Sequence, residues 1–255
     1  MAEFEERNSI WRKQGMHKQE RRYLLRPLII PVILVGIAWT VWWLVANAAV
    51  EFGVRPQTLK GLAGIFFSPF IHDPKDVSHL INNSLPLLFL GWALFYFYRE
   101  LSWKVLAWIW FLSGFWVWIA VQDESVHIGA SGIVYGLASF LFFSGVIRRQ
   151  RNLMGLTLIV SFFYGGMVWG VFPYDLRISW QSHLFGGIAG LILAIVYRKK
   201  GWQREKYAWE DEVVTENFSQ LNERHEAVLH GKIKDPNEID EDPPFTINYE
   251  FVSKE

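Results

Sequence analysis

The sequence contains no cysteine, which excludes disulfide bonds and metal sites built from thiolates. It is also short of charge over long stretches, because six segments of about twenty residues hold no Asp, Glu, Lys or Arg. By contrast, 51% of all residues are hydrophobic and 14 are tryptophan. That is more apolar surface than a soluble domain of this length needs to bury, so the composition favours a protein whose solvent is the lipid bilayer.

The uncharged segments have the length of membrane-spanning helices. Crossing about 30 Å of hydrocarbon at about 1.5 Å per residue takes roughly 20 residues. The first segment does not read as a cleavable signal peptide, because its apolar run is too long and no small-residue cleavage site follows it. We therefore predict an all-α membrane protein with six transmembrane helices, over residues 27–50, 80–98, 105–122, 128–147, 152–174 and 178–197.

The positive charges predict how these spans are oriented. With the N-terminus in the cytoplasm, 17 Lys and Arg flank the spans on the cytoplasmic side and only four lie on the other side. Positively charged residues concentrate in cytoplasmic loops of membrane proteins. We therefore expect an integral membrane protein with both termini in the cytoplasm, located in a bacterial cytoplasmic (inner) membrane.

The charge pattern divides the chain into three parts. Residues 1–26 form a basic cytoplasmic N-terminal segment, 27–200 the six-span core, and 201–255 an acidic soluble tail with fourteen acidic and six basic residues. The tail combines one possible amphipathic surface helix with the sequence DPNEIDEDPP, which is typical of disorder. In the long first loop, GLAGIFFSPF is too short to span and too apolar for water, so we expect a helix in the membrane interface or docked on the bundle.

Three of the spans bring polar side chains to one depth. Spans two, four and six all run from outside to inside, and their outer ends carry His79 with Asn83, then Ser131, then His183. Ser131 alone is also explained by close helix packing, and His183 alone by packing or a proton path. The coincidence of depth favours a functional site.

Small residues predict that spans four and six pack closely. Ser131 and Tyr135 lie one helical turn apart, and His183 shares its face with glycines at helical spacing. Glycine at such positions lets two helices approach, as a hydrogen bond between a serine and an imidazole requires. The expected helix-packing residues are Gly129, Gly132, Gly136, Gly186 and Gly190.

These side chains suit nucleophilic catalysis. Neutral histidine can accept the proton of a serine hydroxyl near pH 7, so Ser131 is the candidate nucleophile and His183 the candidate base. The oxyanion that forms needs donors, for which the Ser131 amide and the side chains of His79 and Asn83 are candidates. Spans four and six hold no carboxylate near the pair, so a dyad fits better than a triad.

At these residues the sequence resembles the rhomboid intramembrane serine proteases. GASG at 129–132 followed by Tyr135 is similar to the family's serine motif, SHLFGGIAG with His183 to its last-span motif, and HLINN with His79 and Asn83 to its second span. The similarity covers roughly residues 25 to 200. One departure is that His72 precedes His79 by seven residues, whereas the family often has a histidine about five residues earlier.

The resemblance implies a fold and a set of roles. The fold would be a six-transmembrane-helix rhomboid bundle with a long interfacial first loop, held in part by Arg55. Ser131 would be the nucleophile and His183 the general base, Tyr135 would stack on His183, and His79 and Asn83 would help form the oxyanion hole. A mobile fifth span and the cap loop at about 169–180 would admit transmembrane protein substrates from the lipid bilayer, to be cut after a small side chain.

Other functions are compatible with parts of this pattern. A catalytically inactive rhomboid-like protein would bind membrane helices without cutting them, but the presence of both Ser131 and His183 favours an enzyme. A small transporter would be expected to have broken helices and further buried charges at mid-membrane depth. We expect no cofactor, no metal site and no nucleic-acid partner.

Overall fold

The computed structural model describes residues 20–122, 124–173 and 179–201. Most of the basic segment 1–26 and nearly all of the acidic tail 201–255 lie outside these residues, as do the expected helix and disordered stretch of the tail. Within the described residues the fold is helical, and the one β-type pairing is an isolated antiparallel bridge between Val54 and His127. This confirms the all-helical class predicted from the sequence.

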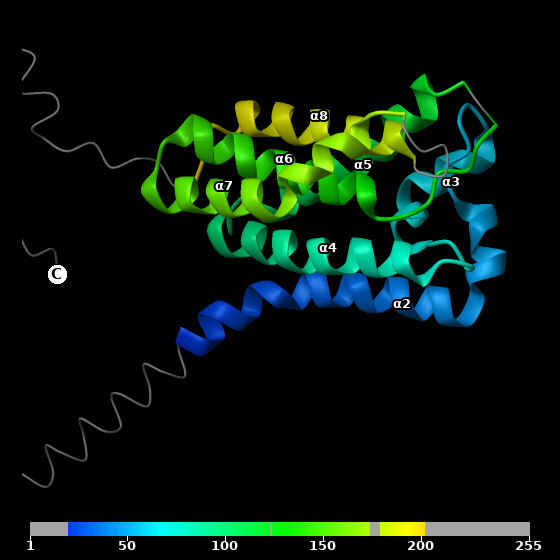
Figure 1. Cartoon of the computed structure of the whole chain (residues 1–255), viewed down its shortest axis with the longest axis horizontal. Helices are drawn as coiled ribbons and strands as arrows, with labels where there is room; N and C mark the ends of the chain where they lie inside the picture. Colours follow the sequence, from blue (N-terminus) through cyan, green and yellow to red (C-terminus); the bar gives the residue numbers. More distant parts are fainter. Residues whose placement is uncertain (1–19, 123, 174–178, 202–255) are drawn as a thin grey trace, which may run out of the picture. The chain divides into compact units, whose positions relative to one another are not determined.

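The helices follow one another with short connections, apart from the loop between the first two long ones (Figure 1). In chain order they are the 3-10 helix η1 (Arg26–Leu28), α2 (Ile29–Ala49), η2 (Val50–Phe52), α3 (Leu59–Phe67), η3 (Ser68–Phe70), α4 (Val77–Phe97), α5 (Ser102–Ala120), α6 (Ser131–Arg148), α7 (Arg151–Tyr164), η4 (Gly165–Val171) and α8 (Trp180–Val196).

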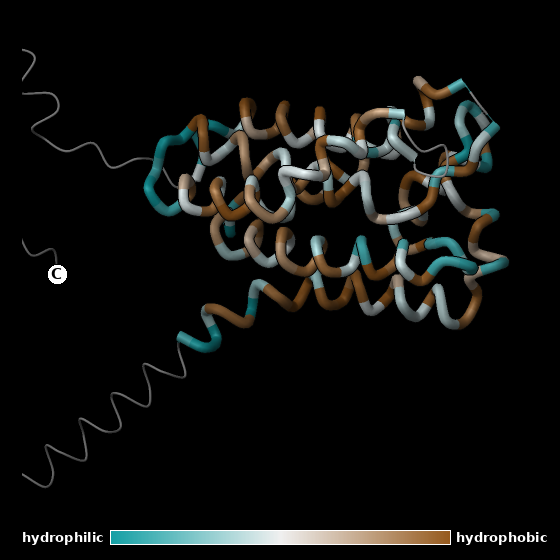
Figure 2. Tube along the Cα trace, viewed as in Figure 1, coloured by the Kyte–Doolittle hydropathy of each residue, from teal (hydrophilic) through white to brown (hydrophobic). Residues whose placement is uncertain are grey.

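Five helical segments in the described part of the chain are long and apolar enough to cross a membrane. They are Glu20–Phe52, Val77–Phe97, Ser102–Ala120, Ser131–Arg148 and Arg151–Val171. The sixth predicted span forms α8, an apolar helix of 17 residues. Figure 2 shows hydrophobic residues along the bundle and hydrophilic ones gathered toward its two ends. The protein is therefore a helical membrane bundle, and the count of six spans stays a prediction.

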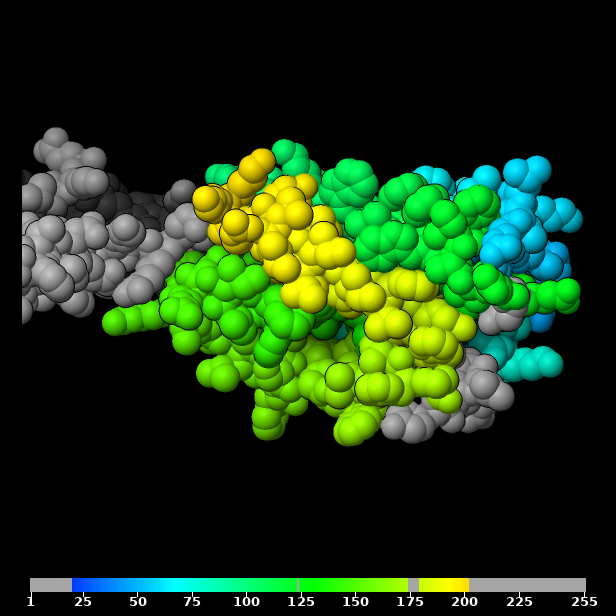
Figure 3. Space-filling model, turned by 90° about the horizontal axis from the view of Figure 1, so that it is seen from above, coloured from blue at the N-terminus to red at the C-terminus, as the bar shows by residue number. Residues whose placement is uncertain are grey.

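Helix α6 lies at the centre of the bundle. Of the residues in its apolar stretch, 61% are buried, against 17% for the segment that contains α7 and 11% for the first span. Helix α6 packs on α4, α5, α7 and α8, whereas α2 lies against α4 at the margin (Figure 1). Helix α8 borders one face of the molecule (Figure 3), where it packs on α5, α6 and η4. The residues at the start of α6 are thus enclosed by several neighbours.

The apolar stretch of the first loop folds as a helix that docks on the bundle. Helix α3 packs on α5, where the Trp110 indole N–H donates to the Ile65 carbonyl at 3.1 Å. A Cβ at Gly114 would lie 3.1 Å from the Ile65 Cα, so glycine permits this approach. Whether α3 also lies in a membrane interface stays a prediction.

The helices α4, α6 and α8 begin at the same end of the bundle (Figure 1). At the start of α4, the Asp76 side chain accepts a hydrogen bond from the Ser78 amide at 2.9 Å, as an N-cap residue does. Before α6, Gly129 has φ +103°, a conformation that L side chains rarely adopt. These local signals fix where α4 and α6 begin.

The fifth predicted span, 152–174, differs from one continuous α-helix. Helix α7 ends at Tyr164, and the chain continues as the 3-10 helix η4 from Gly165 to Val171. Two consecutive glycines, Gly165 and Gly166, stand at this change, and glycine weakens an α-helix. The last part of this segment is therefore wound more tightly, and its carbonyls point to different neighbours.

Candidate active site

The two rings of Tyr135 and His183 stack face to face between α6 and α8. Their centroids lie 4.1 Å apart and their planes differ by 7°. His183 is 7% exposed, so the imidazole is enclosed. Tyr135 lies four residues after Ser131, which places the serine and the tyrosine one turn apart on α6.

Glycines let α6 and α8 approach to backbone contact. A Cβ at Gly186 would lie 2.0 Å from the Gly132 carbonyl oxygen, and one at Gly190 would lie 2.1 Å from the Gly136 carbonyl oxygen. A Cβ at Gly136 would in turn lie 2.3 Å from the side chain of Ile109 on α5. At Gly186 and Gly190 the closest contacted atoms are backbone, so no larger residue fits there without moving a helix, and these two glycines set the distance between α6 and α8.

Ser131 is the first residue of α6 and is buried. The first amides of an α-helix have no acceptor within the helix, so the Ser131 N–H is directed out of the helix end. Among the described residues, no hydrogen bond joins the Ser131 hydroxyl to His183. The structure therefore brings both side chains to the α6–α8 contact without a bond between them.

His79 and Asn83 of α4 lie beside Gly129, two residues before Ser131. A Cβ at Gly129 would lie 2.8 Å from His79 Nε2 and 3.5 Å from Asn83 Nδ2. Asn83 Nδ2 donates to the His79 carbonyl at 3.0 Å, which orients the amide toward the start of α4. The three helix ends thus converge, with α4 contributing an imidazole and an amide.

His72 packs edge-on against His79, with ring centroids 5.0 Å apart. It is 1% exposed, and neither ring nitrogen has a hydrogen-bond partner among the described residues. Burial, and to a lesser degree the neighbouring His79, lowers the pKa of His72 from 6.5 to about 3. This imidazole lies between η3 and α4 and stays neutral at physiological pH.

Two carbonyls of η4 accept hydrogen bonds from the stacked rings. The His183 Nδ1 contacts the Gly170 carbonyl at 2.8 Å, and the Tyr135 hydroxyl donates to the Met167 carbonyl at 2.8 Å. A carbonyl oxygen only accepts, so Nδ1 carries the proton in this contact. The sequence gives no signal for either acceptor, because a backbone carbonyl is common to all residue types.

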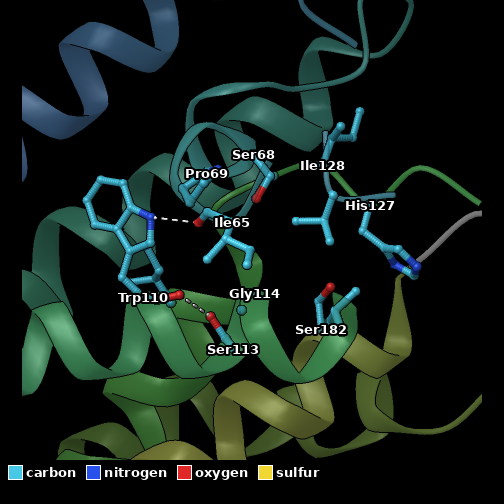
Figure 4. Close-up of a pocket in the computed structure, with 14 residues that line it drawn as sticks. Ile65, Ser68, Pro69, Trp110, Ser113, Gly114, His127, Ile128 and Ser182 are labelled. Atoms are coloured by element: carbon cyan, nitrogen blue, oxygen red, sulfur yellow. Dashed lines mark hydrogen bonds between the residues drawn. The ribbon is translucent and has the colours of Figure 1, made fainter. Parts of the chain in front are cut away.

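A cavity lies next to residues 127–129, the segment that leads into α6 (Figure 4). Its polar lining comes from separate parts of the chain, with Ser68 of η3, Ser113 of α5, His127 of the loop before α6 and Ser182 of α8. The Gly129 amide donates to the Ser68 carbonyl at 2.9 Å and so joins this loop to η3. None of the residues that line the cavity belongs to α4.

Comparison with known proteins places this helical membrane bundle in a family. The model of the Rhomboid domain matches residues 60–200, more than half of the chain. The chain belongs to the rhomboid family, which confirms the resemblance seen in the three motifs.

Similar proteins occur in mycobacteria. Uncharacterized proteins of Mycobacterium bovis and Mycobacterium tuberculosis are each 35% identical over 150 residues, which is 56% of this chain and 62% of the relative. An uncharacterized protein of Mycobacterium leprae is 34% identical over 151 residues, covering 56% of this chain and 59% of the relative. The match spans about three fifths of these relatives.

Proposed function

We propose that this protein is an intramembrane serine protease that hydrolyses peptide bonds in or near transmembrane segments through a Ser131–His183 dyad. The stacking of Tyr135 on His183, one helical turn from Ser131, is the observation that carries the proposal. Membership of the rhomboid family supports it.

The Gly170 carbonyl gives His183 the protonation state that a general base needs. With the proton on Nδ1, the lone pair of Nε2 is available to the Ser131 hydroxyl. In the reaction, Ser131 Oγ attacks the peptide carbonyl carbon while its proton passes to Nε2. The imidazolium then gives that proton to the departing amine, and water hydrolyses the acyl-enzyme.

The oxyanion hole would be built from two helix ends. The Ser131 amide lies at the start of α6, and the His79 ring and Asn83 amide lie beside Gly129. Donors placed in advance where negative charge develops typically contribute about 3 kcal/mol each to transition-state stabilisation. Burial of the site strengthens this effect by excluding water.

The site's surroundings suit a substrate that comes from the bilayer. Helix α7 is largely exposed along its apolar face and leads into η4, whose carbonyls touch both stacked rings. A single-span protein with helix-weakening residues would enter beside this segment, because a helix must unwind before its peptide carbonyl reaches a nucleophile. The distribution of positive charges favours both termini in the cytoplasm, and the mycobacterial relatives favour a bacterial cytoplasmic membrane.

A second candidate is a catalytically inactive rhomboid-like protein that binds membrane helices. The lack of a hydrogen bond between the Ser131 hydroxyl and His183 among the described residues is the observation in its favour. Catalytic hydrogen bonds are often long before substrate binds and tighten in the complex, so this geometry fits the enzyme as well.

Cleavage of reconstituted substrates separates the two candidates. Wild type in liposomes would be incubated with a panel of single-span membrane proteins, and the products mapped by mass spectrometry. We expect cleavage within or near a span, abolished by Ser131→Ala and retained by Ser161→Ala, which removes an exposed hydroxyl on α7. Binding of spans without cleavage by the wild type would favour the inactive protein.

A further inference from the structure

His127 makes contacts that the dyad does not explain. It precedes Ser131 by four residues and is 4% exposed. Its backbone is fixed on both sides by Val54, since each residue's amide donates to the other's carbonyl at 2.9 Å. The backbone of His127 is therefore held to the first loop by these two bonds, independently of the contacts of its ring.

The ring of His127 joins two serines on different segments. Nδ1 lies 2.5 Å from Ser179 Oγ at the start of α8, and Nε2 lies 2.9 Å from Ser125 Oγ in the loop before α6. Ser179 Oγ also lies 2.6 Å from Ser182 Oγ. Figure 4 shows His127 and Ser182 lining the same cavity from the loop and from α8.

Ser179 connects this contact to the catalytic base. The His183 amide donates to the Ser179 carbonyl at 3.3 Å, and Ser179 precedes His183 by four residues. The bond between His127 and Ser179 thus joins the residue four places before the nucleophile to the residue four places before the base. Ser179 uses its hydroxyl in this way instead of capping α8, which has no side-chain cap.

We propose that His127 is a positioning residue for the dyad, which clamps the first turn of α8 to the segment that leads into α6. This inference rests on the proposed function. The glycine contacts set the separation of α6 and α8 along their length, but they leave sliding and rotation of the helix ends to other contacts. The His127–Ser179 bond restrains those movements at the level of Ser131 and His183, where a displacement of about 1 Å costs about 100-fold in rate.

The two ring nitrogens allow a matched pair of variants. Asn places its terminal polar atoms near the position of Nδ1, and Gln places them near Nε2. His127→Asn therefore keeps a partner for Ser179, whereas His127→Gln keeps one for Ser125. If His127 only filled space, the larger Gln would replace it better than Asn. Higher activity of His127→Asn than of His127→Gln would therefore point to the bond with Ser179.

The test is the rate at which a small fluorophosphonate labels Ser131 in the full-length protein in detergent. We expect His127→Ala and Ser179→Ala each to slow labelling on the order of 10- to 100-fold. The double variant should be no slower than the slower single variant, because both remove one contact. His127→Asn should label within about threefold of wild type, His127→Gln should be slowed like the alanine variant, and Ser125→Ala should be unchanged. Melting temperatures would be measured for every variant, and the Asn and Gln pair decides the test if the alanine variant does not fold.

Several results would overturn the clamp. They are wild-type labelling rates in His127→Ala and Ser179→Ala, effects that multiply in the double variant, or equal rates for His127→Asn and His127→Gln. A wild type that is not labelled at Ser131 would overturn the proposed function and this inference with it. A labelled wild type with unaffected variants would overturn this inference alone.

Discussion

Tyr135 and His183 stack at 4.1 Å, and the polar edge of each ring is bonded to a carbonyl of η4, at Met167 for the tyrosine and at Gly170 for the histidine. The stack therefore depends on three segments, α6, α8 and η4. Movement of any of the three segments would disturb the stack, so substitutions in each segment can test its contribution.

The tyrosine ring should matter more than its hydroxyl. Tyr135→Phe keeps the stacked face and loses one hydrogen bond to a carbonyl, so we expect a fall in kcat/KM of about 2- to 10-fold. Tyr135→Ala removes the surface on which His183 rests, and we expect a loss of about 100-fold or more. Cleavage kinetics with one substrate check this order, and an alanine variant as active as the phenylalanine variant would contradict it.

Gly170 lies where any side chain would clash with the stacked rings of Tyr135 and His183. A Cβ there would lie 2.0 Å from the Tyr135 hydroxyl oxygen and 3.2 Å from His183 Nδ1. Gly170→Ala should therefore lose most activity. Adding Tyr135→Phe should restore part of it, because that change removes the hydroxyl oxygen with which the new Cβ clashes. Gly166→Ala, with nothing within 4 Å, is the control in the same segment. Inactivity of that control would mean that η4 tolerates no substitution and that the clash is not the cause.

Neighbouring glycines on α8 should differ in their tolerance of alanine. At Gly186 the Cβ would lie 2.0 Å from the Gly132 carbonyl oxygen, whereas at Gly187 nothing lies within 4 Å. Gly186→Ala should lower stability by about 1 to 3 kcal/mol and abolish cleavage, because backbone has to move. Gly187→Ala should melt at or slightly above the wild-type temperature, since alanine favours a helix. Thermal melts in detergent measure both, and equal melting of the two variants would contradict the packing.

Buried His72 should make stability depend on pH. Its pKa is about 3 in the folded protein and 6.5 without burial. The unfolded chain therefore takes up a proton below about pH 6.5 that the folded protein does not, so stability is full above pH 6.5 and falls as the pH drops toward 3. At pH 5 the loss is roughly 2 kcal/mol, at about 1.4 kcal/mol per pH unit.

The variant His72→Phe isolates this effect. Between pH 7.5 and 5 its melting temperature should fall less than that of wild type, whichever of the two proteins is the more stable at pH 7.5. Parallel pH profiles for the two proteins would show that His72 is not the titrating group.

Much of the fold was predictable because membrane spans carry a strong signal. Each predicted uncharged segment contains an α-helix in the structure, and the motifs around Ser131, His183 and His79 were enough to identify the family, which the comparison confirmed. This signal comes from composition and residue spacing, and both can be read from the sequence without knowledge of the tertiary contacts.

The contacts made by backbone atoms were not predictable. Residue type gives no indication of the carbonyls of Met167 and Gly170. The sequence also predicts one continuous span where the structure changes from α7 to η4. His127 lies two residues before the serine motif that begins at Gly129, but its link to Ser179 joins residues 52 positions apart. Without the fold, no pattern in the sequence places that serine beside the imidazole.

Covalent labelling of Ser131 tests the central claim most directly, because it needs an activated serine and no known substrate. Wild type, Ser131→Ala and His183→Ala would be treated with a fluorophosphonate probe in detergent, and the modified residue identified by mass spectrometry. The dyad predicts labelling of wild type at Ser131 and of neither variant. Equal labelling of all three proteins, or a wild type that stays unlabelled even with a small probe, would contradict it.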